Sequence, residues 1–122
     1  MNFGVLHTMQ ALAASLPIRV LQPEQVLFET DEPGSSILCV LSGAIELRWG
    51  DAGSETFGPG EVLGVGALVS EHHLRHGTAR AVVATELLEM GREQFLFAVQ
   101  ETPMFALELM ASLERRLRGL EQ

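Results

Sequence analysis

The sequence has no lysine, a single cysteine and no long hydrophobic run, and each absence excludes a class of protein. Cys39 has no partner for an internal disulfide, which excludes a disulfide-stapled secreted scaffold. No stretch approaches the roughly 18 apolar residues that a membrane-spanning helix needs. The N-terminus also lacks the basic and apolar regions of a cleavable secretion signal. We therefore expect a cytoplasmic protein without a membrane partner.

Positive charge is scarce, and His and Arg residues cluster in one segment. The 122 residues carry 16 acidic and 8 basic side chains, for a formal net charge of −8. Phosphate backbones repel a chain of this charge, so we expect no nucleic-acid binding by this chain alone. Five of the twelve His and Arg residues nevertheless lie within residues 72–80. Any site for an anion is therefore expected there.

The length and pattern indicate one domain over residues 1–122. Helical spacing of apolar residues predicts an N-terminal helix within 1–16. Residues 17–91 then contain about eight short apolar runs separated by Gly- and Pro-rich turns, and Ile45–Trp49 alternates as a half-exposed antiparallel strand does. Two helices are expected at the end, over 92–100 and 103–120, within a C-terminal segment 92–122. This order predicts an α+β chain built on an antiparallel β jelly roll.

The last predicted helix carries an apolar seam with steps of 4, 3, 4 and 3 residues, the spacing of a coiled coil. We expect this helix to pair with its counterpart in a homodimer. Phe105 and Leu109 lie on another face and could hold the helix against its own domain. The alternative to the dimer is that the helix simply lies across the β core. The seam consists of Ala106, Met110, Leu113, Leu117 and Leu120.

The segment from Gly64 to Gly77 has the features of an anion-binding site. Glycines open a short helix whose free amides could receive an anion, and a guanidinium that can clamp two phosphate oxygens follows at Arg75. His76 would help most when protonated. The alternative for Arg75 is an ion pair with Glu61 or Glu71. The candidate ligand-binding residues are Gly64, Val65, Gly66, Ala67, Arg75, His76 and Gly77.

In order and spacing, several pieces of the chain resemble the cyclic-nucleotide-binding domain of the catabolite-activator type. The resemblance covers roughly residues 18–120 and implies that 64–77 is the family's phosphate-binding cassette, in which Arg75 would hold the cyclic phosphate. It also implies a jelly-roll fold with a C-terminal dimer helix. The matching pieces are 25–28, 36–43, 57–61, 64–75, 85–88 and 114–117.

The chain departs from that family at several ligand positions. Val65 stands where the family has a glutamate that binds the ribose 2′-hydroxyl, and His76 stands where it has Ser or Thr. The positions that would meet the base fall near Leu120 and Glu121, and the turn glycine expected near Thr30 is missing. Because Val65 cannot accept a hydrogen bond from ribose, we expect cyclic AMP to bind weakly. DNA binding is not implied, because no helix-turn-helix follows within the sequence.

Catalytic and metal functions have little support from the residues. Cys39 lies in an apolar run typical of a strand core, and no serine has a base at an interpretable spacing. His72, His73 and His76 lack the spacing of a cupin metal site and are expected to be solvated. We therefore expect a non-catalytic regulatory domain with no cofactor, which senses a small phosphate-bearing or anionic effector such as a cyclic nucleotide. The alternatives are a ligand-free interaction module and a cupin-like metal-dependent enzyme.

Overall fold

The computed structural model describes residues 4–11, 16–51 and 53–120, which form four helices and eight strands. The α+β order predicted from the sequence is confirmed: one helix, a β roll with a short helical insertion, and two helices. In chain order the elements are α1 (Gly4–Ala11), β1 (Ile18–Leu21), β2 (Val26–Phe28), β3 (Ser36–Ser42), β4 (Ile45–Trp49), β5 (Gly53–Phe57), β6 (Val62–Leu63), α2 (Val65–Val69), β7 (Thr78–Ala81), β8 (Thr85–Gly91), α3 (Arg92–Glu101) and α4 (Met104–Leu120).

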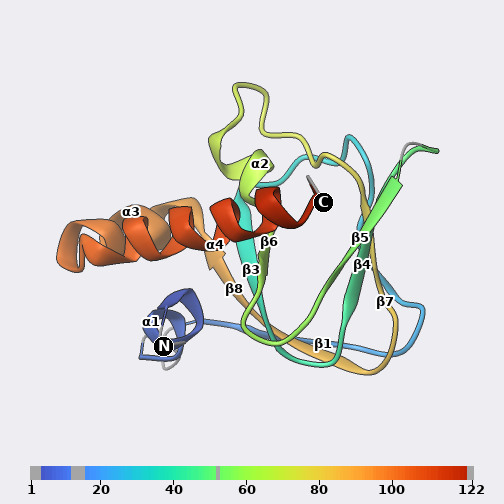
Figure 1. Ribbon diagram of the computed structural model, residues 1–122, viewed down its shortest axis with the longest axis horizontal. Coiled ribbons are helices and arrows are strands. Elements are labelled where there is room, and N and C mark those ends of the chain that lie inside the picture. The colour runs from blue at the N-terminus through green and yellow to red at the C-terminus, as the bar shows by residue number, and fades with distance from the viewer. Residues whose placement is uncertain (1–3, 12–15, 52, 121–122) are drawn as a thin grey trace.

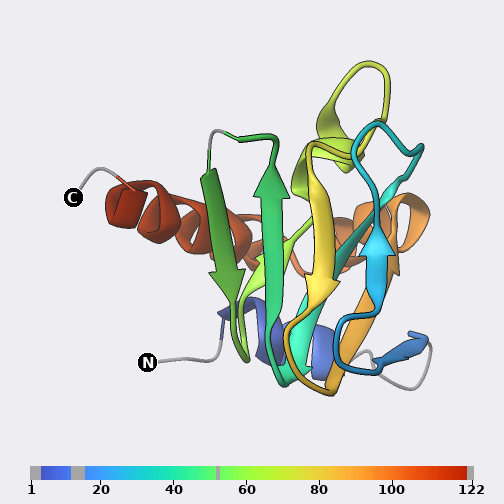
Figure 2. The ribbon, with the colours of Figure 1, turned by 90° about the vertical axis from the view of Figure 1, so that its right-hand side faces the viewer.

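The molecule has three layers. One four-stranded antiparallel sheet has the order β1-β8-β3-β6, and the other has the order β2-β7-β4-β5. Figure 1 shows α1, α3 and α4 gathered on one side of the first sheet, with the second sheet on the opposite side. Figure 2 looks onto the second sheet, with the helices behind it. This is the predicted jelly-roll core with helices covering one face.

Strand β3 of the first sheet is buried on both faces, and this explains why its sequence is continuously apolar from Ile37 to Leu41. Along β3, Ile37 and Cys39 join the cluster beneath the helices, whereas Leu38 and Val40 join the cluster between the two sheets. We call these the helix-side core and the roll core. Both faces of β3 are thus excluded from water, and its apolar run is a consequence of sheet geometry.

The strand predicted over Ile45–Trp49 is confirmed as β4. The structure has α1 over Gly4–Ala11, inside the predicted range 1–16, and residues 1–3 and 12–15 of that range lie outside those described. Pro17 directly precedes β1. None of the described helices is long and apolar enough to cross a membrane.

Helix α4 lies against its own domain through Phe105 and Leu109, as the sequence predicted, and both are buried in the helix-side core. The predicted dimer seam needs correction at Leu113, which packs against this same core instead of facing outward. Met110 and Leu117 are 56% and 58% exposed, and Leu107 lies on the same open face. Ala106 is half-buried, and the side chain of Leu120 lies outside the described residues.

Candidate functional site

The cassette, residues 64–77, folds as a short helix followed by a loop that returns to β7. Gly64 precedes α2 with a φ of 89°, in the left-handed region where glycine is favoured. The His73 ring donates a hydrogen bond through Nδ1 to the Ala67 carbonyl oxygen over 2.8 Å, which closes the loop onto α2. The predicted helical turn over 65–69 is therefore confirmed.

The end of the cassette pairs with the loop between β2 and β3. The Arg75 amide donates to the Glu32 carbonyl oxygen over 2.8 Å, and the Asp31 amide donates to the Arg75 carbonyl oxygen over 3.0 Å. Asp31 has a φ of 66°, so an aspartate makes the left-handed turn near Thr30 where the resemblance led us to expect glycine. Aspartate tolerates this conformation better than most residues. These backbone bonds aim the Arg75 side chain into the molecule.

Arg75 is buried, with only 6% of its surface exposed, and it is held from several sides. Nη1 donates to the carbonyl oxygens of Ser36 and Gly64 over 2.9 and 3.3 Å. Nη2 donates to the Ser36 hydroxyl over 3.0 Å. The guanidinium carbon lies 4.4 Å from the centroid of the Phe28 ring, within the range of a cation–π contact. The predicted ion pair with Glu61 or Glu71 is therefore wrong, because the bonds of Arg75 go to β3 and the glycine turn.

One donor of this guanidinium has no partner. The Nε atom is buried and makes no hydrogen bond within the described residues. Burial lowers the pKa of Arg75, whereas the charges of Glu89 and Glu32 raise it. Arg75 also lines a cavity of about 320 Å³, whose walls include Gly34, Ser36 and Glu89. A buried cation with an unused donor beside a cavity is the arrangement that an anion can complete.

The other predicted ligand-binding residues have different surroundings. Val65 packs against the helix-side core, and Ala67 is buried. His76 is exposed and lies beside Gly66, where an added Cβ would stand 4.0 Å from the His76 Cβ. Gly77 is buried against β4, with no room for a side chain, since a Cβ there would lie 2.9 Å from the Arg48 carbonyl oxygen. The structure therefore brings Gly64 and Arg75 into contact and leaves His76 at the surface.

The sequence analysis missed Ser36, Gly34 and Phe28 as parts of this site. A Cβ on Gly34 would lie 2.4 Å from Arg75 Nε, so the guanidinium fills the space that a side chain would occupy. Ser36 begins the apolar β3 run with a polar side chain that is only 8% exposed. The sequence offered one signal, a serine at the start of an apolar strand. If its hydroxyl is buried there, it needs a hydrogen-bond partner.

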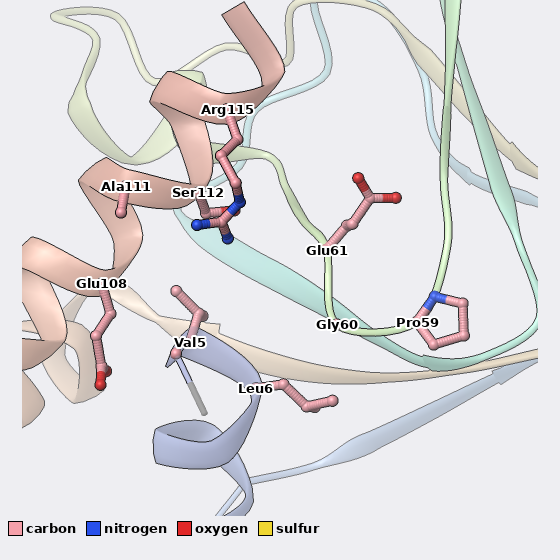
Figure 3. A pocket seen from close by; sticks show the side chains of 10 residues that line it. Val5, Leu6, Pro59, Gly60, Glu61, Glu108, Ala111, Ser112 and Arg115 are labelled. Carbon is pink, nitrogen blue, oxygen red and sulfur yellow. The ribbon is translucent and has the colours of Figure 1, made fainter. Parts of the chain in front are cut away.

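A second missed contact joins α4 to the roll. The Arg116 guanidinium donates to both carboxylate oxygens of Glu55 over 2.6 and 2.7 Å, and its carbon lies 4.2 Å from the centroid of the Phe57 ring. The neighbouring residue Arg115 points elsewhere. Figure 3 shows it extending from α4 into a cavity of about 500 Å³ between α1, α4 and the turn of Gly60 and Glu61.

This larger cavity is poorly suited to an anion. Glu61 and Glu108 both line it, against the single positive charge of Arg115. Their carboxylates already accept hydrogen bonds from the Gly58 amide and the Thr8 hydroxyl. Two carboxylates to one guanidinium disfavour a phosphate at this place, so the site around Arg75 remains the better candidate.

Among the described residues, no group of three or more His, Cys, Asp and Glu side chains could hold a metal ion. Cys39 is fully buried, and burial raises the pKa of its thiol to about 12. The thiolate, which would be the nucleophile, is therefore strongly disfavoured.

Comparisons with known proteins agree with the fold. Residues 18–102 match the model of the cyclic nucleotide-binding domain. The cyclic AMP receptor protein of Thermus thermophilus is 35% identical over 113 residues, which are 88% of this chain and 52% of that protein. The chain thus spans about half the length of this curated relative.

Solved structures agree as well. The crystal structure of the Thermus thermophilus catabolite activator protein superposes with a TM-score of 0.76 at 29% identity, over 94% of this chain and 56% of that one. A structure described with a cyclic-GMP-dependent signalling pathway in bacterial phytopathogenesis superposes with a TM-score of 0.80 at 30% identity, over 92% and 93% of the two chains. Given the family match over residues 18–102 and the shared roll, this chain belongs to the cyclic nucleotide-binding domain family.

Proposed function

We propose that this regulatory domain senses a small phosphate-bearing or anionic effector, which binds at the cassette through Arg75. The observation that carries the proposal is the buried guanidinium with an unpartnered Nε, facing a cavity and set beside the glycine turn. A guanidinium recognises phosphate through two parallel hydrogen bonds, and burial strengthens the attraction because little water screens it. Cyclic nucleotides are the first candidates, since the relatives named above are linked to cyclic AMP and cyclic GMP.

The function is regulatory and not catalytic in this proposal. The two named relatives are a receptor and an activator. In the described residues, the cysteine is buried with a protonated thiol, and the Arg75 guanidinium is engaged by backbone carbonyls. Such a guanidinium serves to bind and orient an anion.

A homodimer would transmit the signal through α4. The exposed apolar stripe of Leu107, Met110 and Leu117 lies on the face opposite Phe105 and Leu109, which hold the helix to its own domain. Met110 and Leu117 also belong to the coiled-coil spacing read from the sequence. A second copy of this chain is therefore the proposed partner. A shift of α4 on ligand binding would change how the two copies meet.

One observation favours a second candidate function, that of an interaction module without a ligand. Three hydrogen bonds of Arg75 already go to protein acceptors, so the site is partly satisfied without an anion. The two candidates make opposite predictions for anion binding.

Calorimetry with cyclic AMP, cyclic GMP and inorganic phosphate separates them. We expect at least one of the three to bind the unaltered chain, and Arg75→Gln to weaken that binding by about 100-fold or more, because a charged bidentate contact is lost. Arg80→Gln is the matched control, since Arg80 is an exposed arginine on β7 beside Glu46. Equal binding by the unaltered chain and Arg75→Gln would contradict the proposal. The absence of binding by all three anions would favour the interaction module.

A further inference from the structure

A chain of hydrogen bonds continues from Arg75 to a carboxylate on β8. The Ser36 hydroxyl, which accepts from Arg75 Nη2, donates in turn to Glu89 Oε2 over 2.7 Å. The other carboxylate oxygen of Glu89 accepts from Arg19 Nη1 over 3.1 Å. Ser36 is a single hydroxyl between two opposite charges, so it holds both in fixed positions.

The carboxylate of Glu89 also acts on Arg75 through its charge. With one hydroxyl between them, the two charged groups lie within about 6 Å of each other, close enough for a strong interaction away from bulk water. Among the charged groups that affect the Arg75 pKa, Glu89 has the largest effect, and it raises that pKa. Glu89 thus serves as a counter-charge for the buried guanidinium.

We propose that Ser36 and Glu89 are positioning residues for the anion-binding arginine, and that the charge of Glu89 competes with the bound anion for Arg75. This inference rests on the proposed function of the cassette. In the unliganded domain the two residues hold the guanidinium against Gly34 and Gly64. When an anion arrives it takes over the role of counter-charge, and the bond between Ser36 and Arg75 weakens.

The same residues stand next to the start of α3. Ser36 pairs with Gly91 across the sheet, and Gly91 is the residue that caps α3. The first residue of that helix, Arg92, donates through Nη1 to the Leu68 carbonyl oxygen in α2 over 3.1 Å. The cassette therefore contacts the beginning of α3 directly through Leu68 and is linked to it indirectly through Ser36, the partner of Arg75. An anion that releases Ser36 loosens one of them, which gives the signal a route to the C-terminal helices.

The variant Glu89→Gln tests the competition, because it removes the charge and keeps an oxygen that Ser36 can reach. At low ionic strength, we expect cyclic AMP, cyclic GMP or inorganic phosphate to bind Glu89→Gln about tenfold more tightly than the unaltered chain. Glu86→Gln is the matched control: it removes one exposed carboxylate from the same strand and should change the affinity less than twofold. A merely structural role for Glu89 predicts equal or weaker binding in Glu89→Gln. That result would overturn the inference.

The second readout is the Arg75 Nε–H signal in ¹⁵N NMR, which requires no ligand. We expect slow hydrogen exchange of this proton in the unaltered chain and in Ser36→Thr, and at least tenfold faster exchange in Ser36→Ala, where the hydroxyl is lost. The same exchange rate in Ser36→Ala and Ser36→Thr would overturn the positioning role. If no anion binds any of the chains, the proposed function and the competition both fail. The exchange comparison then decides the positioning role by itself.

Discussion

The contact between Arg116 and Glu55 makes the sharpest prediction about how α4 is held. Most of α4 packs on the helix-side core, but Arg116 reaches past it to Phe57, a member of the roll core. The variant Arg116→Met keeps an unbranched apolar stem in place of the guanidinium side chain. It removes the charge, both hydrogen bonds to Glu55 and the weaker one to the Val62 carbonyl oxygen over 3.4 Å.

The expected cost follows from the partial burial of the pair. Breaking a fully buried ion pair costs about 3–5 kcal/mol, whereas an exposed pair contributes about 0–1 kcal/mol. The Arg116 and Glu55 side chains are 20% and 15% exposed, and their geometry is bidentate. We therefore expect Arg116→Met to lower the free energy of unfolding by about 2 kcal/mol, including the lost contact with the Phe57 ring. In a double-mutant cycle with Glu55→Gln, the coupling energy should be about 1–2 kcal/mol.

Urea unfolding is the assay, followed by the fluorescence of Trp49 and by circular dichroism at 222 nm. Arg118→Met is the matched control on the same helix, because Arg118 pairs with Glu114 while their side chains remain 72% and 57% exposed. Its expected cost is below about 0.5 kcal/mol. If the two variants lose the same stability, or the coupling energy is near zero, the contact does not hold α4 to the roll.

Three further predictions concern the core, the arginine site and the dimer. Because the sequence has no Tyr and no Lys and burial raises the Cys39 thiol pKa from 9.0 to about 12, stability should fall by up to about 1.4 kcal/mol per pH unit between pH 9 and 11. Unfolding measured at pH 8–11 should show this slope, and Cys39→Ala should abolish it. Gly34→Ala should destabilise the domain by about 1–3 kcal/mol in thermal unfolding, since its Cβ would lie 2.4 Å from Arg75 Nε, whereas Gly119→Ala, with nothing within 4 Å, should not destabilise it. Light scattering should show a dimer, and the double variant Met110→Asp with Leu117→Asp should convert it to monomers. Val69→Asp, a control at another exposed apolar residue, should leave the dimer intact. A monomeric unaltered chain would contradict the dimer.

The fold could be predicted because the apolar pattern of each strand reflects which of its faces are buried. The apolar run of β3 and the alternation in β4 each have a local physical cause, namely two buried faces and one exposed face. Gly and Pro in the connecting turns fixed the element boundaries. The contacts of the α4 seam were harder to predict. The spacing shows that Leu113 lies on an apolar face, but it does not show whether the domain itself or a partner covers that face.

The environment of Arg75 could not be predicted for a related reason. Its acceptors come from Ser36 and Gly64, and its counter-charge comes from Glu89, so the site assembles residues that are far apart in sequence. Spacing within the cassette identified the arginine and the glycine. Only the pairing of the cassette with the loop before β3, through the Glu32 carbonyl oxygen, determines that the side chain points inward.

The cassette and α4 are attached to the roll by the same kind of contact, an arginine guanidinium over a phenylalanine ring. Arg75 of the cassette lies over Phe28, Arg116 of α4 lies over Phe57, and both rings belong to the roll core. Apolar contacts in a close-packed core do not exchange partners without loss of stability, whereas a guanidinium over a ring can turn from one acceptor to another while it keeps its stacking. A stiff roll with two such attachments lets an anion alter the hydrogen bonds of Arg75 without disturbing the core. If an anion binds at Arg75 as proposed, we therefore expect the signal to pass through changes of hydrogen-bond partners around a fixed apolar core.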